Sequence, residues 1–294
     1  MPRKNYIFPD FFATVSGRLP YTPTNDYIFK KLLVKNRKAL KAFLASLLHI
    51  RISDVKNIEI LNPELLPEHI HDKKCILDIH LLLNNSMRIN LEMQAISQTS
   101  WPNRSVIYLC RTFDNLPAGG DYGQLLPAKQ IGILDFTLSP DEPEFFAHYR
   151  MVNVKNQKVF NDNIELCVLD LNQINLATEE DKARGIDLWA RFFKATTWED
   201  LQMLAHEKKI FADCAQTIYD LLQDEEQRLY MQARVDGQLL WQEKEREVKE
   251  AFAKLDAKEA ELSQKDAQLS QKDAQLSQKD AEIARLKAQL AALT

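Results

Sequence analysis

The chain has 294 residues, a formal net charge of −4, and 45% hydrophobic and 27% charged residues, as is ordinary for a globular protein. No apolar run approaches the roughly 18 residues of a membrane-spanning helix, so we expect no membrane partner. The N-terminus lacks the apolar segment of a secretory signal, and the four cysteines form no CxxC pair. These features argue against a disulfide scaffold and a zinc knuckle, and favour a cytoplasmic location.

The charge is unevenly distributed. Residues 1–60 contain 11 Lys/Arg and 4 Asp/Glu, a local charge of +7, so the other 234 residues carry −11. A basic segment attracts a polyanion such as DNA even when the whole protein is acidic. The plainer alternative is a solvated helix face between Lys30 and Lys41.

Proline and glycine indicate a mixed first half and a helical second half. All 11 prolines lie at or before Pro143, and only Gly185 and Gly237 follow Gly132. Hydrophobic periodicity predicts helices over 24–50, with Thr24 as N-cap and a break near Asn36. The later elements follow in chain order: a strand at 55–61, a hairpin at 75–96, a helix at 103–116, strands at 130–136, 145–154 and 164–171, and helices over 179–230. The core candidates of this last region are Trp189, Phe192, Phe193, Leu201, Leu204, Ile218, Leu221 and Leu222.

The C-terminal segment is a repeat. LSQKDAQ occurs at 262–268 and 269–275, followed by LSQKDAE at 276–282, and no Gly or Pro occurs after Gly237. Apolar residues recur every seven positions from Leu255 through Ile283, which favours a left-handed coiled coil. However, Lys follows each repeat leucine by three positions, where a second apolar residue belongs. We expect a weak or partner-dependent coiled coil; a lone solvated helix is the alternative.

The hairpin contains the most informative polar residues. Alternation places Asp78 and His80 on one face of the first strand, and Arg88, Asn90, Glu92 and Gln94 on one face of the second. If 84–86 forms a three-residue loop, Asp78 lies opposite Glu92. Two carboxylates inside apolar strands repel each other and lose hydration, so they need a cation or hydrogen-bond donors. Cross-strand neighbours about 5 Å apart suit a shared Mg²⁺ or Mn²⁺ ion. A half-exposed hairpin with a polar face in water is the alternative.

These residues resemble a known nuclease core. Asp78 followed by Glu92-x-Gln94 is similar to the PD-(D/E)xK pattern, and TNDYIFKKLL, LDIHLLLNNSMRINLEMQ and Arg104-x3-Tyr108 stand in order around it. The same resemblance extends to the sequence from Gly119 to Phe136 and to the segments FFAHYRMVN and FNDNIELCVLDL. The region from 20 to 235 thus resembles the PD-(D/E)xK nuclease family transposases, which include the recombination-promoting nucleases.

The resemblance implies an α/β, restriction-endonuclease-like mixed central sheet flanked by helices. It also implies a metal-dependent DNA endonuclease, linked to recombination, mobile elements or defence. Asp78 and Glu92 would ligate the metal, with the Met93 carbonyl as a third ligand. Gln94 stands where the wider superfamily has Lys; it lacks the charge but can orient a water. Asp26 matches an acidic position on the first helix, although favourable placement at a helix N-terminus explains it equally well.

The remaining polar residues have two readings each. Arg104 and Tyr108 lie one helical turn apart and could contact the scissile phosphate, or serve core and salt-bridge roles. Lys30 and Lys31 could contact DNA phosphates or form a plain surface. His80 is either a neighbour of the active site or a hydrogen-bonded strand residue. No P-loop and no GxGxxG motif occurs, which argues against nucleotide-dependent chemistry.

Two functional hypotheses follow from these patterns. The first is a divalent-metal DNA endonuclease, which dimerises or self-associates through 255–293. The second is a catalytically inactive DNA-binding or oligomeric scaffold protein with a coiled-coil tail. In either case we expect a nuclease-like domain at 1–235, with its catalytic core at about 20–140 and a helical part at 179–235, followed by a long heptad-repeat helix at 236–294.

Overall fold

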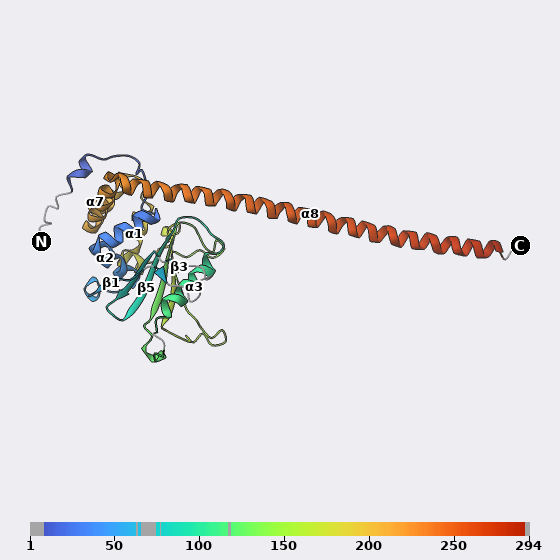
Figure 1. Cartoon of the computed structure of the whole chain (residues 1–294), viewed down its shortest axis with the longest axis horizontal. Helices are drawn as coiled ribbons and strands as arrows, with labels where there is room; N and C mark the ends of the chain where they lie inside the picture. The colour runs from blue at the N-terminus through green and yellow to red at the C-terminus, as the bar shows by residue number, and fades with distance from the viewer. Residues whose placement is uncertain (1–8, 63, 66–74, 77, 117–118, 292–294) are drawn as a thin grey trace. The chain divides into compact units, whose positions relative to one another are not determined.

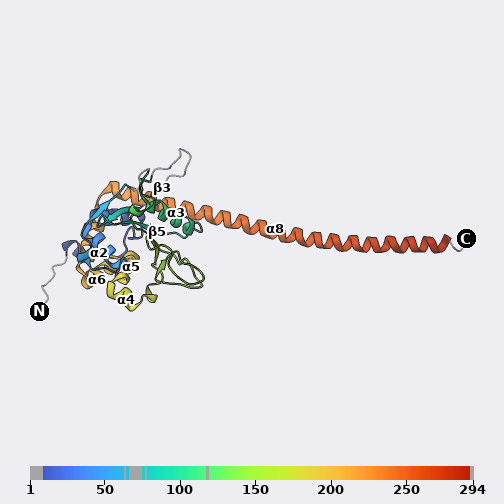
Figure 2. The ribbon, with the colours of Figure 1, turned by 90° about the horizontal axis from the view of Figure 1, so that it is seen from below.

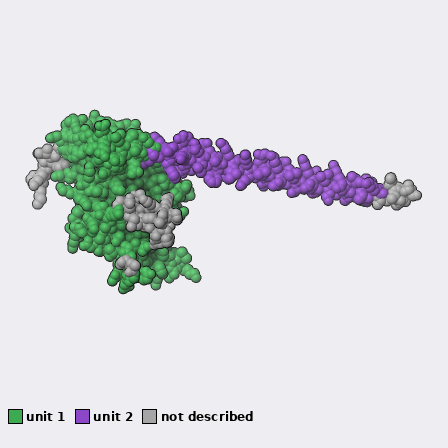
Figure 3. All heavy atoms as spheres, viewed as in Figure 1, with its two compact units in different colours: residues 1–236 green, residues 237–294 purple. Residues whose placement is uncertain are grey.

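The computed structural model describes residues 9–62, 64–65, 75–76, 78–116 and 119–291. The chain divides into two compact units, residues 1–236 and residues 237–294 (Figure 3). The first unit contains the sheet and most of the helices, and the second is a single helical segment.

A six-stranded mixed sheet forms the centre of the first unit. Its strand order is β1-β4-β5-β6-β8-β7, in which β5, β6 and β8 are parallel and the outer strands pair antiparallel. With helices on its faces, this sheet confirms the predicted α/β, restriction-endonuclease-like architecture. The bounds are β1 Ile58–Ile60, β4 Ile79–Leu83, β5 Met87–Gln94, β6 Ala128–Leu134, β7 Phe146–Tyr149 and β8 Ile164–Asp170.

The β4–β5 hairpin has the predicted register. His80 pairs with Asn90 and Leu83 with Met87, around the expected three-residue loop. Asn84 and Asn85 in that loop have φ of 51° and 56°, a left-handed conformation that Asn tolerates better than most residues. The first strand of the predicted hairpin is interrupted, however. Residues Cys75–Ile76 form β3 and pair with β2, Glu64–Leu65, and β4 begins only after a bend at Asp78. Leu77, within the hairpin predicted at 75–96, lies outside the described residues.

The first predicted strand, 55–61, is shorter than expected. The 3₁₀ turn Ile52–Asp54 precedes it, and the ladder to β4 contains only Ile58–Ile60. The backbone N–H groups of Lys56 and Asn57 instead donate to the Asn84 side-chain oxygen, at 2.8 and 3.0 Å. The hairpin loop thus takes the backbone bonds that the strand would otherwise make.

Two short helices begin the described helical layer, α1 at Asp26–Lys35 and α2 at Arg37–Leu47. The N-cap of α1 is Asn25 rather than Thr24, because the Asn25 side chain accepts hydrogen bonds from the backbone N–H groups of Tyr27 and Ile28. The predicted break is at Asn36, which ends α1 and caps α2 by accepting from the Ala39 N–H at 3.0 Å. Asp26 therefore stands at the first helical position, at the positive end of α1.

The main core lies between one face of the sheet and the helices that pack on it. Figure 1 shows α1, α2 and α7 on one side of the strands and α3 on the other, and Figure 2 shows α2, α5 and α6 grouped together. All eight predicted core residues of the helical half are buried. The bounds are α4 Glu179–Arg184, α5 Ile186–Lys194, α6 Trp198–Glu207 and α7 Lys209–Gln223, with further 3₁₀ turns at Asp10–Ala13, Tyr122–Gln124 and Ile174–Leu176.

Helix α3, Trp101–Phe113, covers the opposite face over β5, β6 and β8. Trp101 is fully buried in a small second core with Leu134, Ala147 and Val168. Its ring lies directly on Gly132, where an added Cβ would meet the indole at 2.3 Å. The absence of a side chain at Gly132 therefore sets how closely the start of α3 approaches the sheet.

Helix α8 extends over Glu225–Ala291, which confirms the predicted long C-terminal helix. Its residues after 236 form the second unit, where one apolar side chain is exposed at every seventh position. These residues are Trp241, Val248, Leu255, Leu262, Leu269, Leu276 and Ile283. Among the described residues, the helices include none that is long and apolar enough to cross a bilayer.

Candidate active site

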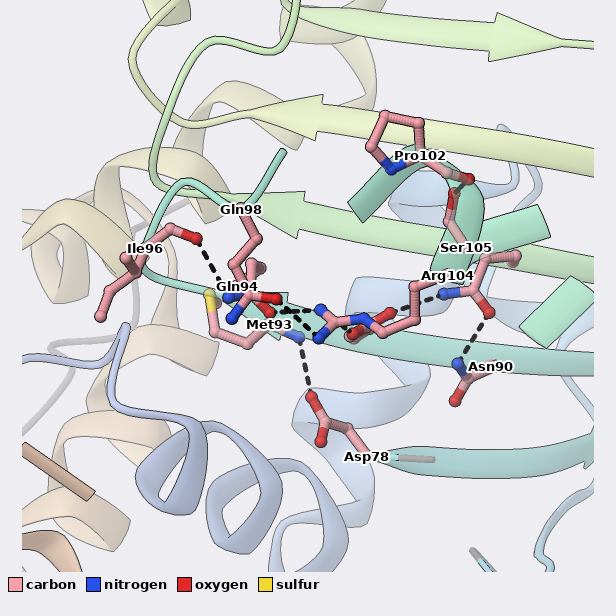
Figure 4. A network of polar contacts seen from close by, with 11 residues as sticks. Asp78, Asn90, Met93, Gln94, Ile96, Gln98, Pro102, Arg104 and Ser105 are labelled. Carbon is pink, nitrogen blue, oxygen red and sulfur yellow. Dashed lines mark hydrogen bonds and ion pairs between the residues drawn. The ribbon is translucent and has the colours of Figure 1, made fainter. Parts of the chain in front are cut away.

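Five of the predicted site residues gather where the end of β5 meets the beginnings of β4, α1 and α3. We call Asp26, Asp78, Glu92, Gln94 and Arg104 the Glu92 site. Figure 4 shows most of this network, with Asp78 at the beginning of β4 directed towards Met93 and Arg104 reaching from α3 across β5. Ile79 pairs with Leu91 in the hairpin. Continuing this antiparallel register by one residue places Asp78 opposite Glu92.

Glu92 is the buried carboxylate of the site, with 5% of its surface exposed. One oxygen, Oε1, lies 2.7 Å from Nη2 of Arg104, and the other accepts a hydrogen bond from Nε2 of Gln130 at 3.1 Å. Burial raises the pKa of Glu92, and the guanidinium of Arg104 opposes that rise. Gln130 in turn accepts from Asn90 at 2.7 Å, so a chain of polar groups holds the carboxylate in place.

Asp78 is the most perturbed carboxylate. Burial raises its pKa to about 7, and repulsion from Glu92 and Asp26 adds to the rise. The Met93 backbone N–H, which donates to Oδ2 at 3.1 Å, and the more distant charge of Lys30 oppose it. No cation lies within ion-pair distance of Asp78 in the described part of the chain. Near neutral pH this site therefore favours a proton or another cation.

Asp26 supplies a third carboxylate from α1. Its Oδ2 lies 3.6 Å from Nε of Arg234, whereas the buried Oδ1 has no hydrogen-bond partner among the residues that the structure describes. Its charge contributes to the raised pKa of Asp78, so the two side chains are neighbours. The favourable position at the N-terminus of α1 accounts for the presence of an acid there, but not for the unpaired oxygen.

Gln94 and Arg104 form a joined pair at the end of β5. Gln94 donates through Nε2 to the Ile96 carbonyl at 3.0 Å, and its Oε1 accepts from Nη2 of Arg104 at 2.6 Å. Nη1 of Arg104 also donates to Oε1 of Gln98, at 2.9 Å. Sequence reasoning missed Gln98 and Gln130. Strand alternation gives a signal for Gln130, which pairs with Asn90 across β5 and β6, but no pattern marks Gln98.

The other predicted residues surround the site less closely. Tyr108 lies beside Arg104, whose guanidinium carbon is 5.9 Å from the ring centroid. Lys31 places its ammonium 5.4 Å from the ring centroid of Tyr27. His80 is buried, and its Nδ1 lies 3.3 Å from the Asn62 carbonyl oxygen. Burial lowers the pKa of His80.

The donor set fits a hard divalent ion. Asp26, Asp78 and Glu92 offer carboxylate oxygens, which such ions prefer, and one Asp26 oxygen is buried without a partner among the described residues. The Met93 carbonyl is also suitably placed. In an extended strand the N–H and C=O of one residue point to the same side, and the Met93 N–H points to Asp78. These groups are the ones that would hold the ion.

A second polar cluster lies on the other face of the sheet. We call Lys129, His148, Arg150, Glu165 and Cys167 the Glu165 cluster. Glu165 forms ion pairs with Lys129 and with Arg150, and His148 Nδ1 lies 3.0 Å from the carboxylate and 3.5 Å from the sulfur of Cys167. Glu, His and Cys side chains this close can bind a metal. Here, however, two cations already neutralise Glu165, and burial raises the pKa of the Cys167 thiol to about 11.

The fold and the Glu92 site define a class of protein. A mixed sheet whose adjacent strands bring an Asp and a Glu-x-Gln together at one end is restriction-endonuclease-like. A family model described as PD-(D/E)XK nuclease family transposase matches residues 23–244, and the chain belongs to this family. No curated protein and no solved structure gives a match. The predicted family is thus confirmed, and its role is nuclease-like or transposase-related. PD-(D/E)XK nucleases generally use divalent metals.

Proposed function

We propose that this protein is a divalent-metal-dependent DNA endonuclease that hydrolyses phosphodiester bonds in the cytoplasm, in recombination, mobile-element biology or defence. The observation that carries the proposal is the juxtaposition of Asp78 and Glu92. Both have a raised pKa, and Asp78 has no ion pair among the described residues. Carboxylates with a raised pKa that face each other in this way cluster at functional sites, and Arg104 alone supplies one positive charge for the two.

We assign the residues roles from the family pattern and from their positions in the site. Asp78, Glu92 and the Met93 carbonyl would hold Mg²⁺ or Mn²⁺, and Asp26 would hold the same ion or a water beside it. When bound, such an ion stabilises phosphoryl charge and lowers the pKa of a coordinated water. Gln94 is fixed between Ile96 and Arg104, so its amide is a rigid group that can orient the attacking water.

DNA contacts are proposed around the same end of the sheet, from α1 on one face and α3 on the other (Figure 1). Lys30 follows Asp26 by one helical turn on α1, and its charge reaches Asp78. Lys31, Arg104 and Tyr108 complete the proposed set, with Arg104 and Tyr108 adjacent on α3. Phosphate contacts by Lys and Arg fix the position of the duplex without reading its sequence.

The direct test is incubation of supercoiled plasmid with the purified protein, with and without Mg²⁺ or Mn²⁺. We expect metal-dependent nicking or linearisation by the natural protein. The Asp78→Asn variant should lose it, because the amide keeps the shape of the side chain but loses the charge. Glu59→Gln is the matched control: it removes an exposed carboxylate from β1 of the same sheet and should leave cleavage unchanged.

Two results would contradict the proposal. Equal cleavage by the natural protein and Asp78→Asn would mean a contaminating nuclease or a different site. No cleavage by the natural protein with any divalent ion, together with retained DNA binding in a gel-shift assay, would favour a non-catalytic, DNA-binding scaffold.

We also propose that the segment 255–293 mediates self-association, with a homodimer as the simplest product. The support is the exposed apolar residue at every seventh position, because a left-handed coiled coil buries such a stripe against a second helix. Leu262, Leu269 and Leu276 should all be replaced by Glu, and the control should carry Glu at Ser263, Ser270 and Ser277. Sedimentation velocity should show a lower mass for the leucine variant alone, and equal masses would refute the dimer.

A further inference from the structure

Arg104 occupies the position from which a metal ion would interact with Glu92. Its Nη2 lies 2.7 Å from Oε1 of Glu92, and the guanidinium also reaches Gln94 at 2.6 Å and Gln98 at 2.9 Å. The side chain is largely buried, with 27% of it exposed. A charge-assisted contact of this length is among the stronger polar interactions in proteins. A residue of the chain itself therefore neutralises the carboxylate of Glu92.

Both oxygens of Glu92 are engaged in this arrangement. Arg104 holds Oε1 and Gln130 holds Oε2. A hard divalent ion binds a carboxylate oxygen at about 2.1 Å, so an ion on Oε1 would lie within about 5 Å of the guanidinium nitrogen and repel it. The two cations cannot share this oxygen at low energetic cost. A metal ion at Oε1 and the guanidinium therefore compete for Glu92.

The residues around Arg104 can stabilise the guanidinium after it leaves Glu92. Gln94 and Gln98 are neutral acceptors that hold it without competing for the metal, and the ring of Tyr108 lies 5.9 Å away and can accept a cation on its face. The position of Arg104 also explains why residue 94 is a neutral Gln where the wider superfamily has Lys. A lysine there would place a second positive charge beside Arg104, at the atom that now accepts its hydrogen bond.

We propose that Arg104 is an exchangeable counter-cation: it holds Glu92 in the metal-free site, a divalent ion displaces it, and the released guanidinium then binds a phosphate oxygen of the DNA. This inference rests on the proposed function and specifies how the site is switched on. Arg104 supplies from α3 the positive charge that Gln94 does not supply from β5. A guanidinium offers several N–H donors in a fixed fork, which matches a phosphate better than a lysine does.

The test is calorimetric titration of Mn²⁺ into the full-length protein, into Arg104→Gln and into Arg111→Gln. Arg111→Gln is the matched control, because it removes one positive charge from the same helix, away from Glu92. The exchange mechanism predicts that Arg104→Gln binds Mn²⁺ about 10-fold or more tightly than the natural protein, since no ion pair has to be broken. Arg111→Gln should stay within about 2-fold. Plasmid cleavage by Arg104→Gln should nevertheless fall, because the phosphate contact is lost.

Equal or weaker Mn²⁺ binding by Arg104→Gln would overturn the inference and make Arg104 a support that merely orients Glu92. If Arg104→Gln does not fold, Arg104→Met serves instead. It also removes the charge while keeping a long side chain, and the exchange mechanism again predicts tighter Mn²⁺ binding than in the natural protein. The failure of the proposed function is a separate result: Mn²⁺ binding by the natural protein would then be absent, or unchanged in Asp78→Asn.

Discussion

Glu92 on β5 and Glu165 on β8 are two buried glutamates of one sheet, and their surroundings are opposite in character. Both are about 5% exposed, and β6 alone separates their strands. Glu92 faces α3 and has one arginine, with Asp78 and Asp26 close by. Glu165 lies on the opposite face and is paired with Lys129 and Arg150, with His148 in contact.

This difference shows that the neighbours of a buried carboxylate, rather than its burial, indicate a cation site. At Glu165 the positive charges of Lys129 and Arg150 exceed the single negative charge of the carboxylate, so the cluster needs no further cation. At Glu92 the single arginine leaves Asp78 without an ion-pair partner among the described residues, and the pKa of Asp78 is raised to about 7. We therefore expect the two glutamates to respond differently to the same substitution.

The rate of plasmid cleavage should show the largest difference between substitutions at Glu92 and at Glu165. Glu92→Gln should lower metal-dependent plasmid cleavage by about 100-fold or more, because a direct ligand matters at least as much as the outer contacts that support ligands. Glu165→Gln should keep cleavage within about 3-fold at a temperature where it remains folded. The measurement is the initial rate of loss of supercoiled plasmid. Comparable losses in both variants would remove the distinction between the two sites.

Folding stability should show the reverse order. Glu165→Gln leaves Lys129 and Arg150 without their carboxylate and should cost about 3 kcal/mol in the free energy of unfolding. Glu92→Gln should cost less, because Arg104 retains Gln94 and Gln98 as acceptors. Urea denaturation followed by circular dichroism gives both values. A larger loss in Glu92→Gln would show that Glu92 is chiefly structural.

The pH dependence of stability should depend on Asp78. Its folded pKa of about 7 lies above the ordinary 3.8, so between about pH 4 and pH 7 the folded state retains a proton that the unfolded state has lost. The free energy of unfolding should therefore fall as pH rises through this window, by about 1–2 kcal/mol after allowance for solvent. Thermal melts should show a flatter profile in Asp78→Asn, whereas Glu165→Gln should keep the slope. An unchanged slope in Asp78→Asn would contradict the raised pKa.

The smallest expected difference concerns Lys30, whose charge acts on Asp78, and Lys129, which pairs with Glu165. Lys30→Gln should weaken DNA binding by about 3-fold and lower the salt dependence of the affinity by about one phosphate contact. Lys129→Gln should leave both quantities unchanged, because that ammonium is committed to Glu165. Fluorescence anisotropy at several salt concentrations measures both. Equal effects of the two substitutions would place the DNA elsewhere.

Sequence reasoning reached the part of the site that depends on local pattern. Alternation and turn chemistry at 84–86 predicted the hairpin register, and from it the approach of Asp78 to Glu92. The helix break at Asn36 and the buried aromatic residues of α5 follow from capping and 3.6-residue periodicity in the same way. These features depend on neighbours within one or two turns of chain.

The missed features depend on contacts between distant segments. Gln98 lies in a connection before α3, and its place beside Arg104 depends on how closely Trp101 packs on Gly132. The strand expected at 55–61 is shortened because Asn84, far along the chain, takes its backbone hydrogen bonds. That Arg104 would bind Glu92 rather than solvent could not be predicted from spacing alone, since helix periodicity gives the direction of a side chain but not its partner.

Mn²⁺ titration of Glu92→Gln, Asp78→Asn and Glu165→Gln beside the natural protein tests the central claim most directly, because it measures the cation site without DNA. The account predicts saturable Mn²⁺ binding to the natural protein, its loss in Glu92→Gln and Asp78→Asn, and its retention in Glu165→Gln. Binding that persists in Asp78→Asn and Glu92→Gln but disappears in Glu165→Gln would contradict the account and place the metal on the other face of the sheet.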